Sequence, residues 1–269
     1  MIFKYILVII LIFTLSCSPT TKEDMNNETS LSPEYLYDEA MIELENTNYT
    51  EASEKFKEIE TKYPLSNEAI QSQIMLAFIN YLNMDYENAI LKLDRIINKY
   101  PSYKEIDYVY YMKGINYYEQ IENPELDSKY NQLSLESFQQ LINRFPNSKY
   151  SNDSRQKIIL LKENLAAKNM NIAMFYLKQK KYLAALNRYN IVVNDHNQSK
   201  YVPEALHRLV EIYYTLGMVE EANKAAAVLG YNYPDSKWYK YSYKILVKTK
   251  KEESFLKNLL NKISKNNNE

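Results

Sequence analysis

The sequence predicts an all-α protein that is built from repeated pairs of helices. The first observation behind this prediction is the composition, because only three of the 269 residues are Gly, whereas roughly 7% is usual. A chain so poor in Gly cannot form many tight hairpin turns or phosphate-cradling loops, which argues against all-β folds, Rossmann domains and P-loop enzymes. The second observation is that small and large side chains recur five times at helical spacing.

The first 31 residues are predicted to be a targeting signal and a tether. A basic residue, Lys4, is followed by an apolar run that is shorter than the ~20 residues needed to span a bilayer, as in a secretory signal peptide. The only Cys, Cys17, follows the small Ser16, which resembles a bacterial lipoprotein signal, although Thr14 stands where those signals usually have Leu. We therefore expect a signal peptide over 1–16, lipidation of Cys17 and a polar, flexible tether over 17–31. The alternatives are an ordinary signal peptide with an incidental Cys and a buried apolar helix.

The residue after Cys17 bears on the destination. In enteric-type lipoprotein sorting an Asp at this place retains the protein in the inner membrane, and this chain has Ser18 instead. By that resemblance the protein is expected at the outer membrane, held by its N-terminal lipid and facing the periplasm.

The repeated unit is a helix that ends at an aromatic residue followed by Pro. Its small residue is Ala52, its large residues are Phe56 and Ile59, and the whole pattern returns after 37 residues. Offsets of this kind place the side chains on one stripe of a helix, and Pro then ends the helix. The five copies carry Ala52, Ala89, Ser134, Ala185 and Ala222 at the small position, and Phe56, Leu93, Phe138, Tyr189 and Ala226 four residues later.

A first helix precedes each of these in four of the copies. A small residue lies twelve positions before the small residue of the second helix, at Ala40, Ala77, Ala173 and Val210. A two-helix unit with small residues facing each other and Pro at its end is the tetratricopeptide pattern. Because one unit cannot bury its apolar face alone, we expect a tetratricopeptide-repeat superhelix of five helix pairs with a concave side.

The repeats divide the folded part into two halves. Ser32 and Pro33 are predicted to begin the first helix, as N-cap and first helical residue. Residues 32–150 hold repeats one to three, with an insertion over 121–128, and residues 151–247 hold repeats four and five. One long helix over 153–180 is expected to bridge the two halves. The Lys/Asn-rich tail over 248–269 contains an amphipathic stripe that either caps the superhelix or binds a partner.

Charge and motif content argue against several functions. The net charge of -1 disfavours a nucleic-acid binder, and one Cys excludes intramolecular disulfides and Cys-based zinc clusters. His196 takes the aromatic turn position of its repeat, His207 lies on a helix, and neither belongs to a zinc motif or adjoins a nucleophile. We therefore predict no enzyme, no metal and no cofactor, with a lipoprotein hydrolase as the disfavoured alternative.

Several stretches are more specific than a bare repeat. Residues 202–217 and 225–239, together with 144–150 and 174–178, resemble the BamD family, the lipoproteins of the outer-membrane β-barrel assembly (BAM) machinery, in its alphaproteobacterial branch. Asn197 departs from the family pattern, which has Pro there. The resemblance implies a non-enzymatic subunit whose C-terminal repeats dock a BamA-type outer-membrane barrel protein, beside other BAM lipoproteins. It also implies that the N-terminal repeats receive the C-terminal targeting segment of unfolded outer-membrane proteins.

Two sets of residues are candidates for these contacts. The inner face of a tetratricopeptide domain comes from the first helix of each pair, and aromatic and Met side chains there could bind an extended peptide. The alternative is that they pack against the neighbouring repeat. For the BamA-type contact, Arg188 and Arg208 are candidates because Arg can hold a carboxylate with two hydrogen bonds. The predicted inner-face residues are Tyr37, Met41, Ile74, Phe78, Tyr81, Tyr108 and Tyr111, with Met112 and Ile115 beside them.

A second function stays open at this point. Other periplasmic tetratricopeptide adaptors, such as those that coordinate cell-wall synthesis with envelope constriction, resemble the chain in its repeats. Those relatives usually carry an N-terminal coiled coil, and no heptad run precedes Ser32.

Overall fold

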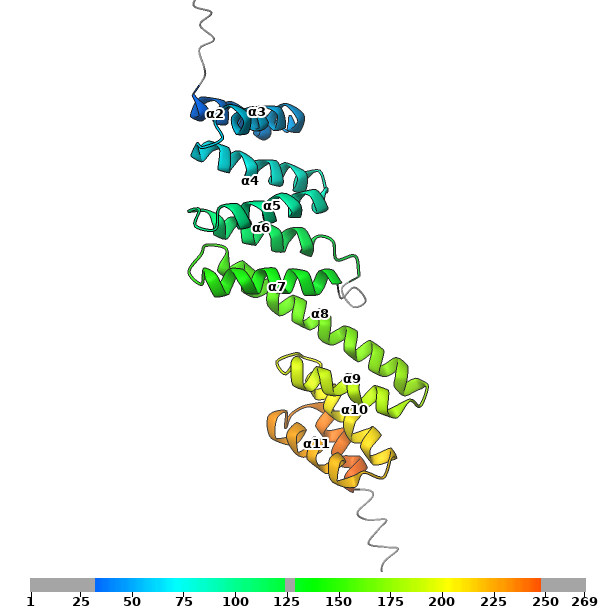
Figure 1. Cartoon of the computed structure of the whole chain (residues 1–269). Coiled ribbons are helices and arrows are strands. Elements are labelled where there is room, and N and C mark those ends of the chain that lie inside the picture. Colours follow the sequence, from blue (N-terminus) through cyan, green and yellow to red (C-terminus); the bar gives the residue numbers. More distant parts are fainter. Residues whose placement is uncertain (1–31, 124–128, 248–269) are drawn as a thin grey trace, which may run out of the picture.

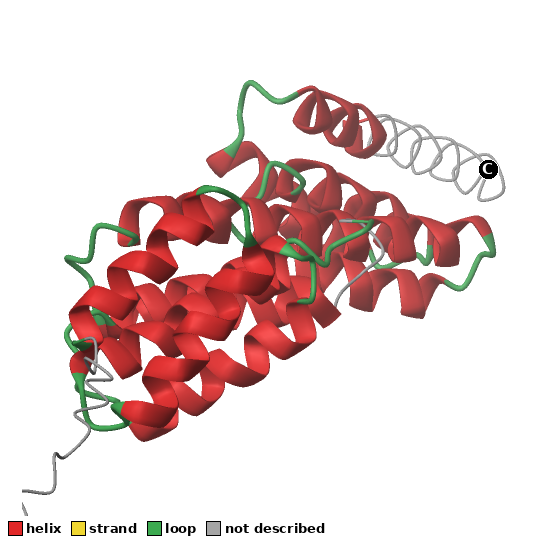
Figure 2. Cartoon of the chain, turned by 90° about the horizontal axis from the view of Figure 1, so that it is seen from above, coloured by secondary structure: helices red, strands yellow, loops and turns green. Residues whose placement is uncertain are grey.

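Helix pairs stacked one on another make up the part of the chain that the computed structural model describes, residues 32–123 and 129–247 (Figure 1). No strand occurs within these residues, and Figure 2 shows the helices joined by short loops. The predicted signal peptide, Cys17, the tether over 17–31 and the tail over 248–269 lie outside the described residues. The predicted superhelix of five pairs is confirmed.

Each pair joins two antiparallel helices of similar length, except the fourth. The helices are α2 Pro33–Glu45 and α3 Tyr49–Lys62, α4 Asn67–Leu82 and α5 Tyr86–Lys99, α6 Ile106–Tyr118 and α7 Lys129–Arg144, α8 Ser151–Lys178 and α9 Tyr182–Asp195, and α10 Val202–Thr215 and α11 Val219–Asn232. A further helix over residues 237–247 follows the last pair. Within the described ranges no helix is long and apolar enough to cross a membrane.

Local sequence explains where the helices begin and turn. Ser32 caps α2, with its Oγ accepting a hydrogen bond from the Tyr35 backbone N–H at 3.3 Å, and Pro33 is the first helical residue as predicted. In four of the five pairs the turn places one described residue in the left-handed region, and among these four only Gly217 is a glycine. Thr47, Met84 and Lys180 take the same conformation with a side chain, at a cost of roughly 1–2 kcal/mol each. The shortage of Gly is therefore tolerated at these turns.

The predicted stripe of the second helices forms the core. Ala52, Phe56 and Ile59 are fully buried, and their counterparts in the later copies are buried as well. In copy three the first helix carries its small residue at Gly114, 37 positions after Ala77, which the sequence pattern did not identify. Gly114 packs directly against the ring of Phe138, since a Cβ placed there would lie 2.6 Å from its Cε1 atom.

Helix α8 joins the two halves of the superhelix. It begins and ends two residues earlier than predicted, and its end is set by Lys180, which leaves the helical region and closes the turn to α9. Its first half packs on α7 through Ile158 and Leu161, and its second half packs on α9 through Ala166 and Ala173. Figure 1 shows it running obliquely from α7 to the C-terminal pairs. The predicted bridging helix is thus confirmed.

Candidate functional site

The first helices of the N-terminal repeats form one continuous face. Helix α2 contacts α4, and α4 contacts α6, whereas α3, α5 and α7 make their main contacts with the first helices next to them in the chain. These first helices can approach each other closely because Ala40 and Ala77, both almost fully buried, have only a methyl side chain. We call the side formed by α2, α4 and α6 the concave face.

A cavity of about 290 Å³ lies on the concave face. Tyr37 from α2, Ile74 from α4 and Tyr108 from α6 line it, so three of the predicted inner-face residues share one cavity although 71 positions separate the first from the last. The remaining lining residues are Gln71, Met75, Glu105, Asp107, Lys149 and Tyr150.

The loop before α8 completes this cavity. The Ser148 hydroxyl donates a hydrogen bond to the Asp107 carboxylate at 2.6 Å, which fixes the loop to the start of α6. The next two residues, Lys149 and Tyr150, then reach the cavity. The ring of Tyr150 lies 5.3 Å from that of Tyr108 and 4.8 Å from that of Tyr111, centroid to centroid. Distances in this range are typical of favourable aromatic pairs.

The hydroxyls of Tyr37 and Tyr108 stay protonated at neutral pH. Burial raises the pKa of Tyr37 to about 12, and Tyr103 and Glu105 add to the shift. Burial also raises the pKa of Tyr108 to about 12, with a further contribution from Tyr150. A neutral phenol both donates and accepts a hydrogen bond, so the face offers partners for the backbone groups of a bound chain.

The other predicted inner-face residues also pack between repeats. Ile74 is 2% exposed, Met112 and Ile115 are buried, and Met41 and Phe78 lie half-buried on the core of the first repeats. Tyr81 and Tyr111 each pack against the core between α6, α7 and α8. The Tyr111 hydroxyl donates to Asp153 at 2.8 Å; burial and this hydrogen bond raise its pKa above the ordinary value. Some of the predicted inner-face residues therefore pack between repeats and others line the concave face. Their binding of a partner stays a prediction.

Sequence reasoning missed the polar half of the cavity. Glu105, Asp107 and Lys149 lie at helix ends and in a loop, where the helical periodicity that selected the aromatic residues carries no information. Tyr150 belongs to the stretch 144–150 that carries the family resemblance, and that stretch was the available signal.

Arg208 has its partners within the last repeats. Its guanidinium pairs with Glu211 at 2.8 Å and Glu204 at 3.3 Å, one turn to either side on α10, and lies 5.4 Å from the ring of Trp238. Arg188 donates to the side-chain oxygen of Asn169 at 3.2 Å. Arg208 is thus engaged inside the chain, and a partner's carboxylate would have to compete with Glu204 and Glu211.

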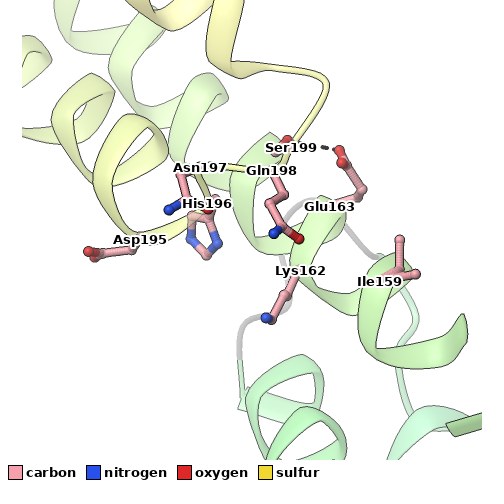
Figure 3. Close-up of a pocket in the computed structure, with 8 residues that line it drawn as sticks. All are labelled: Ile159, Lys162, Glu163, Asp195, His196, Asn197, Gln198 and Ser199. Carbon is pink, nitrogen blue, oxygen red and sulfur yellow. Dashed lines mark hydrogen bonds between the residues drawn. The ribbon is translucent and has the colours of Figure 1, made fainter. Parts of the chain in front are cut away.

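The two histidines have structural surroundings. His207 is 3% exposed, and its Nδ1 lies 2.8 Å from the Ser242 hydroxyl on the helix over 237–247. His196 lines a small polar pocket of about 150 Å³ between α8 and the loop after α9 (Figure 3), and burial lowers its pKa. In that pocket Glu163 accepts a hydrogen bond from Ser199 at 2.9 Å. Among the described residues no group of three His, Cys, Asp or Glu side chains could hold a metal ion.

Comparison with known proteins gives a consistent result. The family model YfiO, described as an outer membrane lipoprotein, matches residues 29–229. The chain is similar to the outer membrane protein assembly factor BamD of Rickettsia prowazekii, with 41% identity over 211 residues that cover 78% of this chain and 84% of the relative. BamD of Caulobacter vibrioides is 38% identical over 79% of this chain and 70% of its own length, and BamD of Neisseria meningitidis serogroup A is 29% identical over 83% and 88%.

Proposed function

Because the chain belongs to the YfiO family of outer membrane lipoproteins, we propose that it is a scaffold on which unfolded outer-membrane proteins meet a BamA-type barrel protein. Its role at the outer membrane is that of a non-enzymatic assembly factor, as for its BamD relatives. To this role we add a lipid anchor, a substrate site and a docking site.

The anchor proposed is the lipidated Cys17, after removal of residues 1–16. Its support is the single Cys placed directly after an apolar run and a small residue. Metabolic labelling with a fatty acid should tag the parent chain and leave a Cys17→Ser variant unlabelled and released from the outer membrane. Equal labelling of the two chains would remove this part of the proposal.

The substrate site proposed is the concave face. The observation that carries it is the cavity shared by α2, α4 and α6, in which aromatic rings meet neutral phenol hydroxyls. An extended chain that alternates aromatic and polar residues would place its rings against Tyr37 and Tyr108 and its backbone groups on their hydroxyls. The C-terminal segment of an unfolded barrel protein has this alternation.

Crosslinking to a peptide tests the substrate site. A photoreactive peptide with the C-terminal sequence of a barrel protein should label the parent chain, and Tyr37→Ala with Tyr108→Ala should reduce labelling severalfold. Tyr37→Phe with Tyr108→Phe keeps the rings and removes the hydroxyls, so it separates packing from hydrogen bonding. Tyr231→Ala is the matched control, because Tyr231 is 88% exposed on α11. Unchanged labelling of the Ala variants with an intact helical spectrum would refute this site.

The docking site proposed for the BamA-type barrel protein is the pair of C-terminal repeats, with other BAM lipoproteins as further partners. Arg188 is the stronger candidate for this contact, because the guanidinium of Arg208 already pairs with two carboxylates of the chain. Arg188→Ala should weaken co-purification of the barrel protein and leave the unfolding midpoint nearly unchanged. Depletion of the whole protein should halt porin insertion, and normal insertion after depletion would instead favour an adaptor in cell-wall synthesis.

A further inference from the structure

The middle of the chain has an unusual charge distribution. Asp and Glu make up 34 of the 269 residues, about one in eight, yet none occurs between Glu163 and Asp195. Five basic residues lie in this interval, namely Lys168, Lys178, Lys180, Lys181 and Arg188. The interval covers the second half of α8, the turn and most of α9.

The α8–α9 turn combines this positive charge with exposed apolar side chains. Phe175, one turn before the end of α8, is 58% exposed, and Leu183, near the start of α9, is 74% exposed. Lys178, Lys180 and Lys181 lie between them, all exposed. Within the described residues none of these three lysines forms an ion pair, and no carboxylate lies in the turn itself.

The α10–α11 turn continues the apolar surface. Leu216, Met218 and Val219 at this turn are each about two-fifths exposed. Helix α9 packs against both α8 and α10, so the two turns follow each other along one edge of the stack, and Figure 1 shows both on the same side. We call these two turns the C-terminal turn edge.

The corresponding turns of the N-terminal repeats differ. In the α4–α5 turn the exposed Met84 has Asp85 and Glu87 as its charged neighbours, and the α2–α3 turn lies between Glu45 and Glu51. The combination of apolar and cationic side chains is therefore a property of the α8–α9 turn and not of the repeat, whereas the α10–α11 turn adds apolar side chains and is followed by Glu220 and Glu221.

We propose that the C-terminal turn edge contacts a membrane surface of anionic phospholipid. Phe175, Leu183 and Met218 would enter the boundary between headgroups and acyl chains, and the three lysines would meet the headgroup phosphates. A long Lys stem lets the ammonium reach the phosphates while the stem stays on apolar surface.

The side chains favour lipid over an acidic protein. All three cations of the turn are Lys, whose ammonium is a point charge, and none is Arg, whose planar fork suits a fixed carboxylate. Fluid headgroups need no fixed geometry. Two small turns bind weakly, so the edge sets the orientation of a protein that is held to the membrane elsewhere. This role rests on the proposed lipid anchor at Cys17 and not on the proposed barrel-assembly contacts.

Quenching by brominated phospholipid tests the contact in the full chain. A Leu183→Trp substitution adds an indole on the C-terminal turn edge, and Met84→Trp adds one on the acidic α4–α5 turn as the matched control. Trp238 is present in both chains and in the parent, which supplies the baseline. With vesicles of brominated phosphatidylglycerol and phosphatidylethanolamine, the indole at position 183 should be quenched severalfold more than that at position 84.

The charge dependence completes the test. K178Q, K180Q and K181Q combined with Leu183→Trp should weaken vesicle binding roughly tenfold or more, since each cation near an anionic surface adds to binding. Replacing the anionic lipid by phosphatidylcholine, or raising the salt, should have the same effect. Equal quenching at the two positions would overturn the proposal, and so would quenching that persists unchanged on phosphatidylcholine. If the fluorescence of the indole at position 183 changes only when a protein is added and not when lipid is added, the edge binds that protein. This result would overturn the proposal as well.

Discussion

Replacing Gly114 by Ala tests how closely α6 and α7 pack in the third repeat. The new Cβ would lie 2.6 Å from Cε1, 2.7 Å from Cδ1 and 2.9 Å from Cζ of Phe138, all shorter than ordinary van der Waals contact. Phe138 is fully buried, so its ring has no solvent into which it could move. The helices must separate or the ring must leave its rotamer.

Two opposing effects set the size of the change in stability. Ala is favoured over Gly in a helix by about 1 kcal/mol. Overpacking a core of this density costs about 1–3 kcal/mol. We expect a net destabilisation of about 1 kcal/mol, which corresponds to a fall in the melting temperature of about 2–4 °C for a domain of this size.

Gly230 supplies the matched control. A Cβ there would lie 2.6 Å from Cε2 of Tyr239, the same distance as at Gly114, but Tyr239 is half-buried and its ring can rotate away. Gly230→Ala gains the same helix propensity with little of the packing cost, so its melting temperature should stay unchanged or rise. Helical ellipticity at 222 nm, followed on heating and in urea, measures both variants.

A double mutant identifies the cause. Repeat two already combines Ala77 with Leu93 at the positions of Gly114 and Phe138. Gly114→Ala with Phe138→Leu should therefore be more stable than the sum of the two single effects, by about 1 kcal/mol of coupling. Strict additivity, or a Gly114→Ala chain at least as stable as the parent, would refute the reasoning.

Three further outcomes are expected. Ser66→Ala removes the N-cap of α4 and should cost about 1 kcal/mol, with faster hydrogen exchange in the first turn of that helix; unchanged exchange would contradict the cap. Ser242→Ala takes the partner from Nδ1 of the buried His207 and should cost about 1–3 kcal/mol, measured by urea unfolding, with earlier proteolysis of the helix over 237–247; equal proteolysis would show that this hydrogen bond does not hold the helix. Tyr108 has a pKa raised from 10.0 to about 12, so the stability that its neutral form contributes is present below pH 10 and is lost as the pH rises through about 12; Tyr108→Phe should flatten the fall of the urea midpoint between these pH values, and an identical fall would contradict the shift.

Much of the candidate site follows from helical periodicity. The spacing of Tyr37, Ile74 and Tyr108 on successive first helices predicts that they share a face, and the structure brings them to one cavity. Periodicity could not find Lys149 or Tyr150, because a loop residue reaches the cavity only through the hydrogen bond between its neighbour Ser148 and Asp107.

Arg208 also shows which contacts the sequence reveals and which contacts only the fold decides. Its residue type and repeat suggested a group available for a partner's carboxylate. Glu204 and Glu211 lie four and three positions away on α10, respectively, and could have been recognised as helix partners from the sequence. The indole of Trp238 is 30 positions distant and covers the guanidinium only because the chain folds back after α11.

By itself the sequence determined the helix pairs, their number and the long bridging helix. These features depend on contacts within about 40 residues, which the 37-residue period records directly in the order of small and large side chains. The tertiary structure alone decided which polar groups stay free, how closely Gly114 and Phe138 approach, and how the two C-terminal turns come to share one edge. Exposure and pairing depend on which repeats stack against each other, and stacking brings together residues whose separation in the chain follows no local pattern.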